Sequence, residues 1–440
     1  MNDRRQELLN SWASALDRAA RVGALNDSKP IAIREIGIIA GPRAGALEID
    51  AGFDAGRLLR SLAADDMALS RQFVPWAFIG QPAVYMQGRY IRVEAGWDDA
   101  QAQKSISVRQ MNVRPNGSGH WLCGMNERGR AVVLHLSDNA PHFLVSGTTG
   151  SGKSVCLRSM VAQLSQRGDA LVLIDGKFGE GLRGLEHLPG VVGPLAVDID
   201  AARSALAWVV AEMVRRYEQG DTSADRLCVV IDEVQELISD PAIVEMIRRL
   251  SAQGRAAHVS IILATQHPTT KALGDDASIK RNVTGRIALR VSDYKASEVA
   301  IGQNSPRADW LLGAGDAYAV VPGQVQRVQI AYYDRREIER MLTAQPRIDE
   351  WPAFAAERME SQQAGQFVAH ELAASLLCAA TGAGRPTMVK RLEMRDGDRA
   401  RRLYRMGREI NDELEAAGAA VCLSGDGIHT GTGLSGVEIA

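Results

Sequence analysis

The chain has 440 residues, of which 46% are hydrophobic and 24% charged, and its formal net charge is −2. This length allows two or three domains with hydrophobic cores. The near-neutral charge excludes a polycation that binds nucleic acid over its whole surface, so any such contact depends on local patches or on the inside of an assembly. The five cysteines are scattered and lack C-x-x-C spacing, which argues against a disulfide framework or a zinc site and favours a reducing cytoplasm.

The N-terminal part is expected to form a helix followed by a mixed domain. Leu8, Trp12 and Leu16 recur at helical spacing, which predicts an amphipathic helix within residues 1–29 that docks on the domain behind it. Short strand-like runs and one helical stretch near residues 54–62 predict an α+β domain over residues 30–125. No apolar h-region and no apolar run of membrane-spanning length occurs, so neither a signal peptide nor a transmembrane segment is expected.

Residues 126–345 alternate between apolar strands and helices. Several strands are almost continuously apolar, as is typical of a parallel sheet that is buried on both faces. Helices are expected between them, at Ala201–Tyr217 and Pro241–Gln253. The predicted strands are Phe143–Val145, Ala170–Ile174, Leu227–Ile231, Ser260–Ala264, Gly285–Val291 and Ala317–Val321. This pattern predicts an α/β motor-type fold, and the loop described next makes it a RecA-like P-loop NTPase.

A phosphate-binding loop follows the first of these strands and fits the pattern G-x-x-x-x-G-K-[ST]. Glycines let consecutive backbone N–H groups point at phosphates, and the helix that follows adds its positive N-terminal end. The residues expected to hold ATP are Gly147, Thr148, Thr149, Gly150, Ser151, Gly152, Lys153, Ser154 and Val155. Lys153 is expected to contact the β- and γ-phosphates, and the Ser154 hydroxyl is expected to bind Mg²⁺.

Two further strands end in polar residues that complete the predicted site. Leu227–Ile231 is followed by Asp232 and Glu233, the form of a Walker B element. An aspartate in this position binds the Mg²⁺ shell, and a glutamate beside it orients and deprotonates the attacking water. A third strand ends near Gln266, which is expected to sense the γ-phosphate. Arg255, just before that strand, is a candidate for an arginine finger that enters the site of a neighbouring subunit.

The C-terminal part is expected to be a linker and a small helical unit. Residues 346–365 are polar, and residues 366–440 contain amphipathic patterns at Phe367–Ala380 and Arg399–Gly418. Arg401, Arg405 and Arg408 share one face of the second pattern. Two interpretations stay open: a winged helix that contacts DNA, with a strand near residues 419–423, or a helical cap with a solvated arginine face.

The chain resembles the FtsK/SpoIIIE family of ring-forming DNA translocases over roughly residues 120–325. Beside the P-loop and the Ala264-Thr-Gln-His-Pro268 segment, four further motifs carry the resemblance. They are Asp175-Gly-Lys177, Glu212-Met-Val-Arg-Arg-Tyr217, Arg286-Ile-Ala288 and Leu311-Leu-Gly-Ala-Gly-Asp316. The resemblance implies a homo-oligomer, a hexamer, with double-stranded DNA in its bore and with ATP sites between subunits that Arg255 completes in trans.

Three departures from the family pattern set this chain apart. The hydrophobic membrane-spanning N-terminus of the family is absent, Gly176 replaces a proline, and Glu298 stands where relatives carry an arginine. These departures favour a form from a mobile element, a phage or a plasmid-transfer system. The sequence identifies no partner in a membrane or in a division or transfer machinery.

The expected function is therefore ATP-dependent translocation of double-stranded DNA by a cytoplasmic, Mg²⁺-dependent ATPase. Two alternatives stay open. One is an ATPase of a protein-secretion or conjugative coupling system, which keeps the hydrolytic site and changes the cargo. The other is a nucleotide-switched DNA-binding regulator, which needs no hydrolysis and is disfavoured by the Asp232–Glu233 pair.

Overall fold

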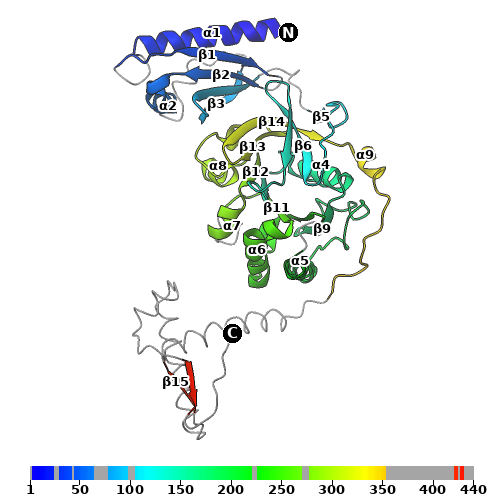
Figure 1. Cartoon of the computed structure of the whole chain (residues 1–440). Helices are drawn as coiled ribbons and strands as arrows, with labels where there is room; N and C mark the ends of the chain where they lie inside the picture. The colour runs from blue at the N-terminus through cyan, green and yellow to red at the C-terminus, as the bar shows by residue number, and fades with distance from the viewer. Residues whose placement is uncertain are drawn as a thin grey trace. The chain divides into compact units, whose positions relative to one another are not determined.

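The computed structural model describes residues 2–23, 29–41, 44–63, 78–97, 105–220, 225–269, 277–352, 421–424 and 427–430. The chain divides into two compact units, Met1–Phe354 and Ala355–Ala440. The first unit contains both a small and a large β-sheet (Figure 1).

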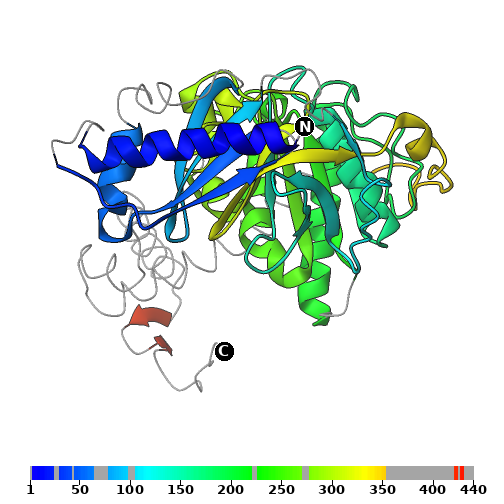
Figure 2. The same ribbon diagram turned by 90° about the horizontal axis from the view of Figure 1, so that it is seen from above.

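The small sheet is antiparallel, with strand order β1-β2-β4-β3, and carries two helices. Its elements are α1 (Asn2–Arg21), β1 (Glu35–Ala40), β2 (Ala44–Asp50), α2 (Ala55–Ala63), β3 (Phe78–Gln87) and β4 (Tyr90–Trp97). Helix α1 lies along the sheet, as Figure 2 shows, because its apolar stripe needs a partner surface. Leu9, Trp12 and Leu16 are almost fully buried in one core with Leu47 and Leu58.

The large sheet has strand order β7-β6-β14-β13-β12-β8-β11-β10-β9, with β5 paired to β14. Strands β9 to β12 and β8 run parallel, and β13, β14, β6 and β7 extend the sheet antiparallel. The strands are β5 (Ile106–Ser107), β6 (His120–Asn126), β7 (Ala131–His135), β8 (Phe143–Ser146), β9 (Ala170–Asp175), β10 (Leu227–Asp232), β11 (Val259–Thr265), β12 (Gly285–Leu289), β13 (Asp316–Val321) and β14 (Gln324–Tyr332).

Helices connect the parallel strands, and their ends carry the residues that stabilise helix termini. They are α4 (Lys153–Gln166), α5 (Ile199–Gln219), α6 (Pro241–Gln253), α7 (Ala277–Asn282), α8 (Tyr294–Ile301) and α9 (Arg335–Glu339). The Asp198 carboxylate accepts a hydrogen bond from the Ala201 amide at 2.8 Å, and Asp240 caps α6 in the same way. Gly220 ends α5 in the left-handed conformation that glycine adopts without strain.

A buried polar network joins the small sheet to the large one. The Glu94 carboxylate on β4 is fully buried and accepts hydrogen bonds from Tyr318 on β13 at 2.7 Å and from Arg92 at 2.9 Å. Next to it, Arg327 on β14 forms a bidentate ion pair with Asp316 at 2.9 and 2.6 Å. Because a buried charge needs partners, the network fixes how the two sheets meet.

The predicted fold class is confirmed for the first unit. Every strand and helix predicted in residues 126–345 is present within a few residues of its expected ends, and β11 lies between β8 and β10 as the site requires. Strands β2, β6 and β14 were not predicted. Strands β6 and β7 belong to the large sheet, and residues 344–351 lie against the large-sheet half, where Trp351 donates a hydrogen bond to the Pro194 carbonyl at 2.8 Å.

The predicted helices at residues 367–380 and 399–418 lie outside the described residues. In the second unit the structure describes an antiparallel hairpin of β15 (Val421–Ser424) and β16 (Gly427–Thr430), at the position expected for a strand. Among the described residues, no helix combines the length and the apolar character needed to cross a bilayer.

Candidate functional site

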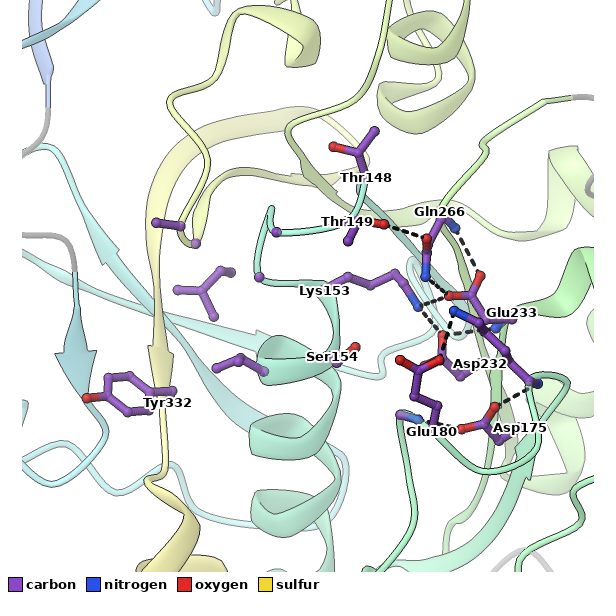
Figure 3. Close-up of a pocket in the computed structure, with 18 of the residues that line it drawn as sticks. Thr148, Thr149, Lys153, Ser154, Asp175, Glu180, Asp232, Glu233, Gln266 and Tyr332 are labelled. Carbon is purple, nitrogen blue, oxygen red and sulfur yellow. Dashed lines mark hydrogen bonds and ion pairs between the residues drawn. The ribbon is translucent and has the colours of Figure 1, made fainter.

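A cavity of about 600 Å³ lies at the carboxyl ends of the parallel strands. The P-loop, the ends of β9 and β10, Gln266 and part of β14 line it (Figure 3). Ligands of open α/β sheets bind at this edge. The cavity therefore contains the predicted phosphate-binding loop and both predicted carboxylates in one place.

The P-loop leaves β8 and turns into α4 through two glycines in the left-handed region. Gly150 has φ +77° and Gly152 has φ +105°, angles that are strained for other residues. A Cβ on Gly152 would lie 3.0 Å from the Gly315 amide nitrogen. Because α4 begins at Lys153 and its glycine N-cap offers no side-chain acceptor, the amides of the first turn can bind an anion.

Lys153 is buried and points at the two carboxylates that follow β10 (Figure 3). Its Nζ forms an ion pair with Asp232 Oδ1 and lies 3.0 Å from Glu233 Oε1. Burial raises the pKa of the Asp232 carboxyl, and the positive charge of Lys153 opposes this shift. The lysine thus offsets one of the two negative charges that the acidic pair can carry.

Glu233 is held in place by three donors besides Lys153. Its backbone is left-handed, with φ +50°, and its carboxylate accepts hydrogen bonds from the Gln235 side chain at 2.6 Å and from the Gln266 amide nitrogen at 3.3 Å. The Gln266 side-chain amide donates to the same carboxylate. Burial alone would raise the pKa of Glu233, but these hydrogen bonds and the charge of Lys153 outweigh burial and lower it. Glu233 is therefore ionised at neutral pH, as a base must be.

Gln266 connects the P-loop to the acidic pair. Its side-chain oxygen accepts a hydrogen bond from the Thr149 hydroxyl at 2.9 Å, while its nitrogen donates to Glu233. Residue 266 directly follows β11, which lies between β8 and β10, so the side chain spans the two neighbouring strand ends. This position suits a residue that responds to the γ-phosphate.

Two parts of the cavity wall were not predicted. The Asp175 carboxylate accepts hydrogen bonds from the amides of Lys177, Gly181 and Leu182 at 2.9, 2.8 and 3.1 Å and so shapes the loop beside Asp232. The motif Asp175-Gly-Lys177 was identified in the sequence, but no role was predicted for Asp175. The opposite wall includes Gln329, Ile330 and Tyr332 of β14, and no sequence motif indicated these residues.

Arg255 does not lie in this cavity. It belongs to the short 3₁₀ turn η4 (Gly254–Ala257), which precedes β11 at the end remote from Gln266. Its side chain is exposed and forms no hydrogen bond or ion pair with the described residues. Of the predicted site residues, Gly147 and Ser151 are buried in the P-loop and do not line the cavity, and Arg255 lies apart from it.

The residues present fit a magnesium nucleotide. The P-loop amides and Lys153 match phosphate oxygens, and an exposed Ser154 hydroxyl with the Asp232 carboxylate provides the hard oxygen donors that Mg²⁺ prefers. A parallel sheet with this loop, an aspartate at the end of a nearby strand and an adjacent glutamate defines the class of P-loop ATPases.

Comparison with known proteins then gives a matching family model. Residues 108–304 match the model of the FtsK/SpoIIIE family. The resemblance predicted from the motifs is thereby confirmed.

Several curated proteins are similar over about half of the chain. DNA translocase FtsK of Leptospira interrogans is 31% identical over 268 residues, which is 54% of this chain and 28% of that protein. DNA translocases SftA and SpoIIIE of Bacillus subtilis are 34% and 30% identical over 50% and 54% of this chain and over 25% and 34% of their own lengths. The chain thus spans about a third or less of these relatives.

Among solved structures, the pCW3 conjugation coupling protein TcpA, in its monomer form with ATPγS, has a similar fold. The TM-score is 0.52 at 21% identity, and the similarity covers 74% of this chain and 99% of that one. At this level of identity the likeness concerns the fold, and it extends beyond the family-matched segment.

Proposed function

We propose that the protein is an ATP-driven translocase of double-stranded DNA that works as a hexameric ring. The observation that carries the proposal is the assembled group of Lys153, Asp232, Glu233 and Gln266, which supplies a phosphate-binding cation, a metal ligand, a base and a sensor in one cavity. The match to this family model and the similarity to DNA translocases support DNA as the cargo. The exposed Arg255, outside its own cavity, supports an ATP site shared between subunits.

The residues take the following roles. When ATP enters, Lys153 turns from Asp232 to the β- and γ-phosphates, and the P-loop amides bind the remaining oxygens. Ser154 and Asp232 would hold Mg²⁺, which would supply positive charge beside the phosphates. Glu233 orients the attacking water and accepts its proton, and Gln266 reports the loss of the γ-phosphate to the P-loop through Thr149.

The three cysteines among the described residues fit a reducing compartment. Cys123, Cys156 and Cys228 are all buried free thiols. Burial raises the pKa of the Cys156 thiol to about 12, so it is unreactive at neutral pH. These buried thiols support the proposal that the protein works in the cytoplasm.

The decisive test is the effect of DNA on ATP turnover. Long double-stranded DNA should stimulate hydrolysis, and the stimulation should fall steeply between about 50 and 200 mM salt because phosphate contacts release counterions. Imaging with DNA and an ATP analogue should show six subunits around the duplex. A turnover rate that ignores DNA at low salt, together with capture of a protein substrate, would favour the secretion ATPase instead.

Glu233→Gln is the matched variant for the hydrolytic role. It should bind ATP and DNA normally and lose about 10² to 10⁴ in kcat, because a general base contributes that much. The control is Glu236→Gln, since Glu236 is exposed and lines no part of the cavity. Full biological activity of Glu233→Gln would refute the motor and revive the nucleotide-switched regulator.

A further inference from the structure

The turn that carries Arg255 is held at both ends by consecutive residues of α5. The Tyr217 hydroxyl donates a hydrogen bond to the Gln253 carbonyl, and Arg216 Nη1 donates one to the Ala257 carbonyl at 3.0 Å. These two carbonyls lie two residues before and two residues after Arg255. The last turn of α5 therefore defines where this short segment begins and ends.

Arg216 is itself fixed before it reaches the turn. Its side chain is 7% exposed, and its Nε donates to Glu212 at 2.9 Å, one helical turn earlier. Hydrogen bonds from Arg215 and Arg216 lower the pKa of Glu212 although burial opposes this shift, so the anchor is an ionised carboxylate. A buried guanidinium held by a carboxylate keeps one orientation and offers its remaining N–H groups in a fixed direction.

The backbone of the turn around Arg255 is closely packed. Gly254 is buried, and a Cβ at this position would lie 2.6 Å from the Val259 carbonyl oxygen. His258, which ends the turn, has φ +55°, and its amide donates to the Arg255 carbonyl at 3.1 Å. Backbone this compact, with both flanking carbonyls bonded, holds the exposed Arg255 in place. Figure 1 shows the surrounding elements α5, α6 and β11.

We propose that Arg216 and Tyr217 are positioning residues for Arg255. The inference rests on the proposed function, in which Arg255 completes the ATP site of a neighbouring subunit. An arginine that stabilises a transferring phosphate has to arrive within a fraction of an ångström, because a displacement of about 1 Å can cost roughly 100-fold in rate. Strand β11 connects the turn that carries Arg255 to the ATP site of the same subunit. It starts just after this turn and ends, about 20 Å away, next to Gln266.

The test uses Tyr217→Phe, which removes one hydroxyl from a side chain that is 46% exposed, so the fold is preserved. DNA-stimulated kcat should fall about tenfold or more while KM for ATP stays within about twofold, because the subunit's own P-loop is untouched. Added to Arg255→Ala, the same substitution should cause no further loss, since there is no finger left to position. Tyr90→Phe is the matched control, because its hydroxyl bonds only the adjacent Arg89 and should leave kcat unchanged.

The outcomes separate this inference from the proposed function. If Arg255→Ala retains normal DNA-stimulated turnover, the trans role fails and the positioning role falls with it. If Arg255→Ala is strongly slowed but Tyr217→Phe and Arg216→Lys, both folded by circular dichroism, turn over like the unmodified protein, only the positioning inference is overturned. If Tyr217→Phe lowers DNA-stimulated kcat by the same factor with and without Arg255, the positioning inference is likewise contradicted, because equal losses indicate a structural effect.

Discussion

The side-chain amide of Gln266 donates a hydrogen bond to the carboxylate of Glu233 across the ends of two adjacent strands. One residue expected to sense the nucleotide is thus bonded directly to the residue expected to activate water. The bond also stabilises the ionised form of the carboxylate, so it sets the pH range in which Glu233 can accept a proton.

Gln266→Ala should move the acid limb of the kcat profile to higher pH. The hydrogen bond from Gln266 lowers the pKa of Glu233, so its loss raises that pKa, and the base becomes protonated earlier as the pH falls. The measurement is DNA-stimulated turnover followed from neutral pH to below 4.5, the ordinary value from which the pKa of Glu233 is lowered. The control is Thr149→Val, which removes only the hydrogen bond between Thr149 and Gln266 and should leave the acid limb of the kcat profile in place. An unshifted acid limb in Gln266→Ala would contradict the effect of Gln266 on the pKa of Glu233.

Lys153→Ala should abolish ATP hydrolysis and also destabilise the nucleotide-free protein. Its removal leaves Asp232 and Glu233 buried without their cation, a change that costs about 3–5 kcal/mol of unfolding free energy. Because the pKa of Asp232 is already raised by burial, this deficit should shrink at acid pH, where the carboxyl takes up a proton. Urea unfolding at pH 7 and pH 5 measures the difference, about 1 kcal/mol or more, and a deficit that does not depend on pH would show that the ion pair is unimportant.

Glu94→Ala should weaken the packing of the small sheet against the large one and lower the free energy of unfolding. It removes the shared acceptor of Tyr318, Tyr85 and Arg92 and leaves a buried guanidinium with fewer partners, for a loss of about 3 kcal/mol or more. Tyr318→Phe deletes one bond of the same group and should cost about 1 kcal/mol. Thermal unfolding of both single variants and the double variant gives the coupling; strictly additive losses would argue against a network.

His142 should make the protein acid-sensitive. It is buried at the start of β8, where its Nδ1 accepts a hydrogen bond from the Ile261 amide at 3.1 Å, and burial lowers its pKa from 6.5 to about 4. Since the unfolded chain binds a proton that the folded one rejects, stability should fall as the pH drops from 6.5 towards 4, by about 1.4 kcal/mol per pH unit. His142→Phe should flatten this slope, whereas the exposed His187→Gln should keep it.

Residues whose role depends on neighbours in sequence could be predicted, and those whose role depends on distant contacts could not. The P-loop is recognised from the local spacing of its residues. The Asp232–Glu233 pair is recognised from the apolar strand that precedes it. Strand β14 does not, because Arg327 and Gln329 give it a polar pattern although both are buried. Their partners, Asp316 and the Ala314 carbonyl, are more than ten residues away and are brought to them only by the fold.

The network around Glu94 bears on which stretch of the chain forms one structural unit. The segment that matches the family model begins at residue 108, yet the carboxylate that Tyr318 donates to lies ahead of that point, on β4. Strand β14 carries Arg327 into this network and, two residues later, Gln329 into the wall of the ATP cavity. A chain trimmed to the matched segment, residues 108–304, would lose both sides of this network, Glu94 on β4 and its partners on β13 and β14, together with the β14 wall of the cavity. The matched segment and the stretch that holds the complete cavity are therefore different parts of the sequence.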